Sequence, residues 1–183
     1  MEYIYIGDVV NTHGLKGEIR IISNFKYKDL IFKKGNTLYI GYQKDKKVIN
    51  SYRYHKIYDM VTLEGINTIE EVIIYKGDKV YINREDYDLP GPVDEDLIGL
   101  DVYNEGNKIG IVDGILKSNA HDILVIMNNK QKSYVPYVDE FILNIDLENK
   151  RIDIKVIEGL LNEDWYFNFI PWNVWRIYKW VNY

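Results

Sequence analysis

The feature that most constrains this fold is a succession of short segments rich in β-branched and aromatic residues or alternating between apolar and polar ones. In the first half of the chain these segments are Tyr3–Gly7, Glu18–Ile22, Thr37–Tyr42, Ser51–Tyr58 and Asp78–Asn83. A period of two places every second side chain on the same side of a strand. The pattern therefore predicts a mainly β protein.

One segment between these strands has helical spacing instead. Asn67 is a good N-cap, Glu70 follows it three residues later as in a capping box, and three apolar residues then share one face of a short helix that ends near Gly77. A single capped helix among strands predicts a barrel with one helix added.

A segment rich in chain breakers divides the chain. Pro90, Gly91 and Pro92 follow one another, and seven acidic residues occur between Glu85 and Asp101. This composition predicts a solvated linker. A second run of predicted strands follows it, namely Gly99–Tyr103, Lys108–Leu116, Asp122–Met127, Lys132–Pro136 and Arg151–Val156.

Composition excludes several classes of function. The chain has no cysteine, which excludes disulfides, thiolate zinc sites and cysteine nucleophiles and favours a reducing compartment. His13, His55 and His121 lack the close spacing of a metal site, and no nucleophile motif occurs. No stretch reaches the ~18 apolar residues of a membrane span, and Met1–Val10 lacks the basic start of a signal peptide. We expect no catalytic site and no metal site.

Charge is distributed unevenly along the chain, whose formal net charge is -5. Residues 1–88 contain 14 basic and 13 acidic side chains, whereas residues 89–183 contain 9 and 15. Residues 16–56 contain 11 basic side chains and 3 acidic ones, interleaved with Phe25, Tyr27, Phe32 and Tyr42. Such an excess is typical of an RNA-binding surface, on which the rings would stack on bases. The alternative is a solvated lysine-rich face over core aromatics.

The densest local pattern is the run from Asn11 to Glu18, N-T-H-G-L-K-G-E. Two glycines three residues apart allow a tight turn whose N–H groups would meet a phosphate, with Lys16 adding charge. The run lacks the Gly-Lys-Ser/Thr of a P-loop. A hairpin connection is the favoured interpretation.

Three groups of segments, in this order, resemble the ribosome maturation factor RimM family. The first is Ile6–Ile21, with its His-Gly-Leu-Lys-Gly-Glu run, and the second extends from Leu63 to Glu85. The third resembles the PRC-barrel half of the family and comprises Asp96–Val102, Gly110–Val112, Ala120–Ile126, Val135–Val138 and Ile145–Ile152. Together they extend over residues 3–161.

The resemblance implies two small β-barrel domains. We expect an N-terminal RimM-type β-barrel with a short helix at residues 1–86, a linker at 87–95, a PRC-barrel domain at 96–161 and an atypical aromatic tail at 162–183. It also implies a non-enzymatic, cytoplasmic assembly factor without a cofactor. Such a factor binds the head of the immature small (30S) ribosomal subunit and promotes 16S rRNA processing. We expect a monomer.

The resemblance and the charge pattern together predict two sets of contacts. The resemblance implies 16S rRNA and a basic ribosomal protein of the subunit head, ribosomal protein S19 in the family, as partners. The residues predicted to bind RNA and the ribosome are His13, Gly14, Lys16, Gly17, Arg20, Lys33, Lys34, Lys46 and Lys47. Those predicted to bind the ribosomal protein are Tyr103, Asp122, Pro136, Tyr137 and Phe141. Tyr103 is included because Pro92 and Val93 stand where the family commonly has aromatic residues.

The C-terminal segment departs from the family. Residues 162–183 contain nine aromatic residues, including all four tryptophans. We expect either a variable extension packed over a barrel or an altered reading frame. One alternative is a peripheral membrane adaptor that uses this tail at the interface. The other is an RNA-modifying or hydrolytic enzyme, which would need carboxylates gathered around His13 in a cleft.

Overall fold

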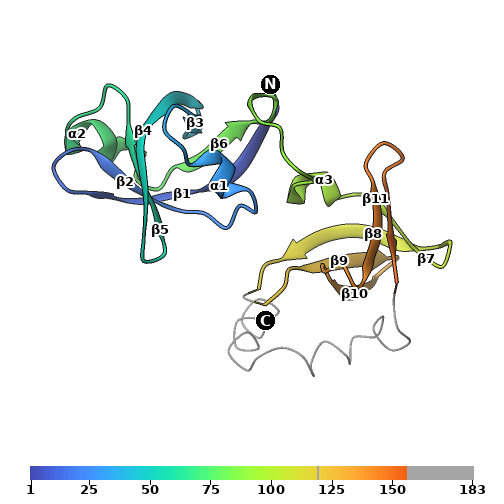
Figure 1. The fold of residues 1–183 in the computed structure, drawn as a ribbon. Coiled ribbons are helices and arrows are strands. Elements are labelled where there is room, and N and C mark those ends of the chain that lie inside the picture. The colour runs from blue at the N-terminus through green and yellow to red at the C-terminus, as the bar shows by residue number, and fades with distance from the viewer. Residues whose placement is uncertain (119, 156–183) are drawn as a thin grey trace. The chain divides into compact units, whose positions relative to one another are not determined.

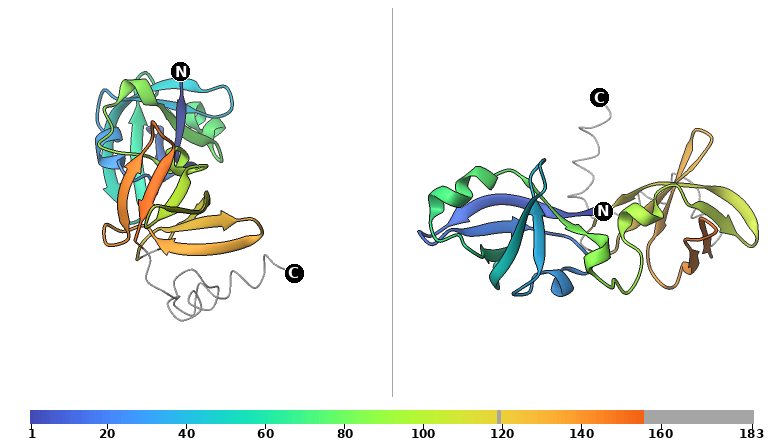
Figure 2. Two further views of the ribbon diagram at one scale, coloured as in Figure 1. Left: turned by 90° about the vertical axis from the view of Figure 1, so that its right-hand side faces the viewer. Right: turned by 90° about the horizontal axis from the view of Figure 1, so that it is seen from above.

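A computed structural model describes residues 1–118 and 120–155 of the chain. The chain divides into two compact units, Met1–Gly91 and Pro92–Tyr183, and Figures 1 and 2 show the elements of each. The aromatic segment 162–183, predicted to be either an extension packed over a barrel or an altered reading frame, lies outside the described residues.

The first unit is a closed six-stranded barrel in the order β1-β2-β5-β4-β3-β6 (Figure 1). Its strands are β1 (Tyr3–His13), β2 (Glu18–Ile22), β3 (Thr37–Ile40), β4 (Asp45–His55), β5 (Tyr58–Leu63) and β6 (Lys79–Asn83). Neighbouring strands are antiparallel, and β6 closes the barrel by pairing with both β1 and β3. This confirms the predicted β-barrel.

Alternation along the strands fills the barrel with apolar side chains. Ile4 and Ile6 of β1 and Val80 and Ile82 of β6 are at most 2% exposed. Tyr5 lies between Ile4 and Ile6 on β1 and is 38% exposed, as expected for a residue on the outer face. Each fully buried aliphatic side chain contributes about 1.5–3 kcal/mol relative to an exposed one.

Short helical segments join the strands, and they outnumber the single predicted helix. They are α1 (Lys28–Ile31), α2 (Ile69–Val72), the 3₁₀ turn η1 (Ile73–Tyr75) and the 3₁₀ turn η2 (Arg84–Asp86). The predicted cap of α2 is wrong by one residue, because Thr68 is the N-cap and Glu71 the reciprocal partner. The Glu71 carboxylate accepts the N–H groups of Asn67 and Thr68, both at 3.0 Å. These hydrogen bonds, that from Asn67 first, lower the pKa of Glu71.

The predicted strand Ser51–Tyr58 is wrong, because it is two strands. β4 ends at His55, β5 begins at Tyr58, and a two-residue turn joins them. Lys56 in this turn has a φ of +58°. Glycine, asparagine and aspartate are the residues that signal this left-handed conformation in a sequence, and none stands here.

One carboxylate is buried in the first unit. Asp59 is 0% exposed, lies 3.2 Å from Nζ of Lys28 and accepts the hydroxyl proton of Tyr52 at 2.9 Å. The Tyr52 ring stacks on Phe32 with 5.6 Å between centroids. Burial, reinforced by the hydrogen bond to Asp59, raises the pKa of Tyr52. The ammonium and the phenol together compensate the desolvation of the carboxylate.

The second unit is a six-stranded sheet in the order β10-β9-β8-β7-β12-β11. Its elements are α3 (Asp94–Leu97), β7 (Asp101–Asn104), β8 (Asn107–Leu116), β9 (Ile123–Asn128), β10 (Gln131–Pro136), β11 (Ile142–Asp146) and β12 (Arg151–Ile154). The neighbours are antiparallel except β12 and β7, which are parallel. β11 was not predicted, since its sequence, Ile142-Leu-Asn-Ile-Asp, does not alternate between apolar and polar residues over its whole length.

The sheet curls around a core of its own. The buried residues are Leu97, Leu100, Val102, Val112, Leu124, Ile126, Val135, Ile152 and Ile154. The end strands β10 and β11 are joined by residues 137–141 alone, a segment that reaches about 20 Å at most. The two ends of the sheet are therefore drawn toward each other.

Removing the ammonium that faces the buried carboxylate should destabilise the first unit. Lys28→Met keeps the apolar stem but leaves Asp59 with the Tyr52 hydroxyl, so we expect a loss of about 2–3 kcal/mol in the free energy of unfolding. Urea unfolding measures it. Lys33→Met, at an exposed position, is the control. Equal unfolding free energies for the two variants would show that the buried pair is not stabilising.

Candidate functional site

The Asn11–Glu18 run forms a hairpin between β1 and β2, as predicted. His13 pairs with Glu18 at the ends of the two strands, and the four residues between them form the turn. Leu15 is 83% exposed and Lys16 is exposed beside it. The hairpin therefore presents one apolar and one cationic side chain at its tip.

Gly17 joins this hairpin to the segment before α2. Its φ is +72°, and a Cβ added there would lie 2.7 Å from the carbonyl oxygen of Thr68 and 3.1 Å from Cγ2 of Ile66. Gly14, at the other side of the turn, has a similar φ of +65° but no atom within 4 Å of its added Cβ. Gly14 is thus required by backbone conformation alone, whereas Gly17 is also required by close packing.

A polar network extends from His13 across the neighbouring strands. The Arg20 guanidinium lies 2.7 Å from Nδ1 of His13, and the Arg53 guanidinium on β4 contacts both carboxylate oxygens of Glu18 at 2.8 and 2.6 Å. The hydrogen bond to Glu18 raises the pKa of Arg53. Glu18 and Arg53 were absent from the predicted site, because only the register of β1, β2, β5 and β4 brings them together.

The four predicted lysines lie along the β3–β4 pair. Lys33 and Lys34 are exposed just before Gly35, whose N–H donates to the carbonyl of Ile49 on β4. Lys46 and Lys47 are paired with the central residues of β3. Lys46 is exposed, and Nζ of Lys47 lies 5.7 Å from the centroid of the Tyr75 ring.

The predicted RNA-binding residues therefore fall into two groups. His13, Lys16 and Arg20 belong to the β1–β2 hairpin, whereas the four lysines belong to the β3–β4 pair. In the barrel order β5 separates β2 from β4, and β6 separates β1 from β3. Part of the basic excess also has structural partners, since Lys28 faces Asp59 and Arg53 faces Glu18.

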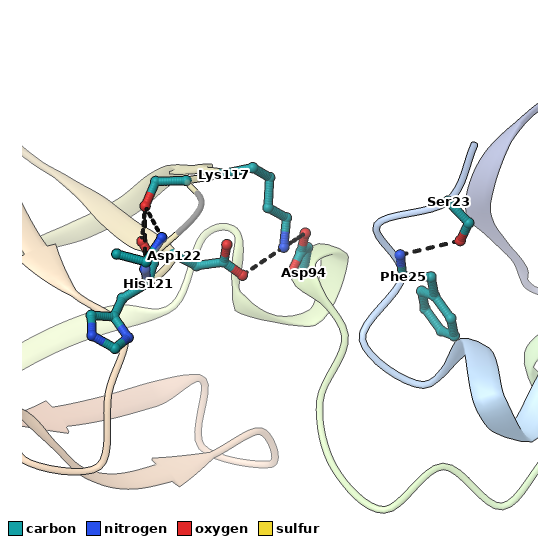
Figure 3. Close-up of polar contacts among 8 residues, drawn as sticks. Ser23, Phe25, Asp94, Lys117, His121 and Asp122 are labelled. Atoms are coloured by element: carbon teal, nitrogen blue, oxygen red, sulfur yellow. Dashed lines mark hydrogen bonds and ion pairs between the residues drawn. The ribbon is translucent and has the colours of Figure 1, made fainter. Parts of the chain in front are cut away.

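The aromatic residues predicted to stack on bases differ in exposure. Tyr42 is 98% exposed, as a stacking surface requires, but Phe32 is 2% exposed and the prediction for it is wrong. Phe25 and Tyr27 contact each other edge to face at 5.9 Å. The N–H of Phe25 donates to Oγ of Ser23 at 3.2 Å, which fixes the start of this segment (Figure 3).

Three residues predicted to bind a ribosomal protein are gathered at one edge of the second unit. The N–H of Tyr137 donates to the carbonyl of Asp122 at 2.7 Å, and Pro136 pairs with Ile123. Phe141 lies at the other end of the segment 137–141 that joins β10 to β11. Tyr137 and Phe141 both pack against the core.

Tyr103 does not join this group. It lies on β7, which β8 separates from β9, and Cζ of Arg151 lies 3.9 Å from the centroid of its ring. Arg151 also donates to Asp153, and this hydrogen bond lowers the pKa of Asp153. The Tyr103 ring is thus covered on one face by a guanidinium of its own unit.

Lys117 bridges two carboxylates that the sequence analysis did not connect (Figure 3). Its Nζ lies 2.7 Å from Oδ2 of Asp94 at the start of α3 and 2.8 Å from Oδ2 of Asp122. Burial acts to lower the pKa of Lys117, but the hydrogen bonds to Asp122 and Asp94 outweigh it and raise that pKa. The bridge ties the predicted linker to the loop before β9 and leaves one net negative charge.

Within residues 1–118 and 120–155, no group of three or more histidine, aspartate or glutamate side chains is placed to hold a metal ion. Among these residues, no helix is long and apolar enough to cross a membrane.

Comparison with known proteins assigns both units. The model of the RimM N-terminal domain matches residues 4–87, and the model of the RimM PRC barrel domain matches residues 94–160. The chain belongs to the RimM family. The first RimM domain thus coincides with the closed barrel and the second with the curled sheet.

Relatives in the RimM family match over nearly their whole length. A protein named ribosome maturation factor RimM from Bacillus cereus (strain G9842) is 37% identical, over 87% of this chain and 99% of that protein. The protein of the same name from Staphylococcus haemolyticus is 37% identical with the same coverage. A solution structure of the N-terminal domain of RimM from Thermus thermophilus is 18% identical, covers 49% of this chain and 98% of that one, and has a TM-score of 0.40.

The two glycines of the hairpin allow a matched test of its packing. Gly14→Ala should cost about 1 kcal/mol for the left-handed backbone alone. Gly17→Ala pays the same cost and also forces its Cβ against the Thr68 carbonyl, which adds about 1–3 kcal/mol. Thermal and urea unfolding of both variants measure the difference. Equal losses would mean that the hairpin does not pack on the α2 segment.

Proposed function

We propose that this protein is a non-enzymatic assembly factor that binds the head of the immature small (30S) ribosomal subunit and promotes 16S rRNA processing. One observation carries the proposal: this chain contains both RimM domains. It also aligns with 99% of the length of a relative named ribosome maturation factor RimM. The proposal includes action in the cytoplasm as a monomer, without a cofactor.

The first unit is proposed to contact 16S rRNA. Lys33, Lys34 and Lys46 are exposed along the β3–β4 pair, and Lys16 is exposed at the hairpin tip. Tyr42, 98% exposed, lies in the turn between β3 and β4, where a base would stack on its ring. Exposed lysines and an exposed ring offer the two kinds of contact, to phosphates and to bases, that unpaired RNA requires.

The second unit is proposed to bind a basic ribosomal protein of the subunit head, ribosomal protein S19 in the family. Residues 92–155 contain 12 acidic and 7 basic side chains. The surface around Asp122, Pro136, Tyr137 and Phe141 includes the Lys117 bridge, which leaves a net negative charge. Complementary charge steers a basic partner toward such a surface. Tyr103 lies on β7 and would act as a separate contact.

Neutralising four lysines of the first unit should weaken binding to small subunits and flatten its salt dependence. In the variant Lys33→Gln, Lys34→Gln, Lys46→Gln and Lys47→Gln, the slope of log affinity against log salt should shrink by about 3, because each phosphate contact contributes about 0.7–0.9. Binding to immature small subunits across a salt series measures this slope.

The control removes equal charge from the second unit. Its substitutions are Lys108→Gln, Lys130→Gln, Lys132→Gln and Lys150→Gln, all at exposed positions. This variant should keep the salt slope of the parent protein. An unchanged slope in the first variant would contradict RNA contact through these lysines.

A further inference from the structure

The β4–β5 pair forms a ribbon that extends past the rest of the barrel. The β3–β4 ladder ends at the pair of Thr37 with Val48, whereas the β4–β5 ladder continues to the pair of His55 with Tyr58. On the other side, β2 pairs with β5 as far as Asp59, so that only Tyr58 and the turn extend beyond β2. Figure 1 shows this ribbon projecting from the barrel. Its tip, Lys56 and Ile57, is therefore open to a partner.

Cations on and beside this ribbon exceed the carboxylates that can neutralise them. Glu18 is occupied by Arg53, and the buried Asp59 is occupied by Lys28. In the described part of the chain, no carboxylate oxygen lies within 4 Å of the charged nitrogens of Arg20 or Lys56. Uncompensated positive charge therefore remains at the tip of the ribbon, on Lys56, and on the neighbouring strand β2, at Arg20.

Aromatic rings lie beside these cations. The Tyr54 ring is 58% exposed and has Nζ of Lys28 at 4.8 Å from its centroid. The Tyr58 ring has Cζ of Arg20 at 5.6 Å. Ile57 at the tip is 62% exposed. Rings of the projecting ribbon thus lie beside cations of the neighbouring elements α1 and β2.

We propose that this ribbon binds unpaired nucleotides of ribosomal RNA, with Lys56 on a phosphate and Tyr54 stacked on a base. In unpaired RNA the phosphates would bind the cations and the bases would stack on the rings. An acidic peptide would satisfy Lys56 and Arg20 but would supply no flat surface for Tyr54. The inference rests on the proposed contact with 16S rRNA and adds a site that the lysines of the β3–β4 pair do not include.

The backbone conformation of the turn allows Lys56 to be replaced without disturbing the fold. Lys56 has a φ of +58°, in the left-handed region that glycine adopts at no steric cost. Lys56→Gly therefore removes the charge while retaining a residue that suits the turn. Lys150, in the turn between β11 and β12, has a φ of +51° and is also exposed. Lys150→Gly is thus a matched control in the other unit.

The experiment measures binding of the full chain to a protein-free transcript of the 16S rRNA head domain across a salt series. Lys56→Gly should lower affinity about three- to tenfold and reduce the salt slope by about 0.7. Tyr54→Ala should lower affinity about tenfold without changing the slope, and Tyr54→Phe should retain binding, because stacking needs the ring and not the hydroxyl. Lys150→Gly should bind like the parent protein.

The outcomes distinguish failure of this binding site from failure of the proposed function. If Lys56→Gly and Tyr54→Ala bind the transcript as the parent does, the ribbon is not an RNA site, even where the four-lysine variant loses binding. If both variants keep RNA binding but lose binding to purified small-subunit proteins, the ribbon is a protein contact and the inference is overturned. If the parent protein binds neither transcript nor immature subunits, the proposed function itself fails. Urea unfolding of each variant establishes that it is folded.

Discussion

The pairing of β6 with both β1 and β3 closes the first barrel, and the arrangement of every surface on that unit depends on it. Closure fixes which of two successive side chains along a strand faces the interior of the barrel. Ile4, Ile6, Val80 and Ile82 fill the interior, so the intervening polar and aromatic side chains lie outside. The β4–β5 ladder continues beyond the β3–β4 ladder, and this produces the projecting ribbon.

The two units differ in net charge because of their composition, and they also differ in how their carboxylates are paired. In the first unit the two carboxylates near the ribbon are bound by Lys28 and Arg53, and other cations remain exposed. In the second unit one lysine, Lys117, serves two carboxylates. The net charge of -5 therefore describes neither surface. This separation is the basis for the proposal that the first unit contacts RNA and the second a basic protein.

Sequence patterns predicted the parts of the fold that depend on local periodicity. Alternation identified most strands, and the Asn11–Glu18 run identified the β1–β2 hairpin. Features that depend on tertiary contact were missed. The turn at Lys56 lacks a glycine signal, the burial of Phe32 follows from stacking on Tyr52, and the Lys117 bridge joins residues 23 positions apart. Tertiary structure likewise places the predicted RNA-binding residues, which follow one another in the sequence, in two groups on different strand pairs.

The central claim is that this RimM-family protein acts on a subunit that is still being assembled. Co-sedimentation of the purified full chain with immature small subunits, mature small subunits and whole ribosomes tests it most directly. The account predicts binding to immature small subunits and little binding to mature ribosomes. Equal binding to all three particles, or binding to none, would contradict it.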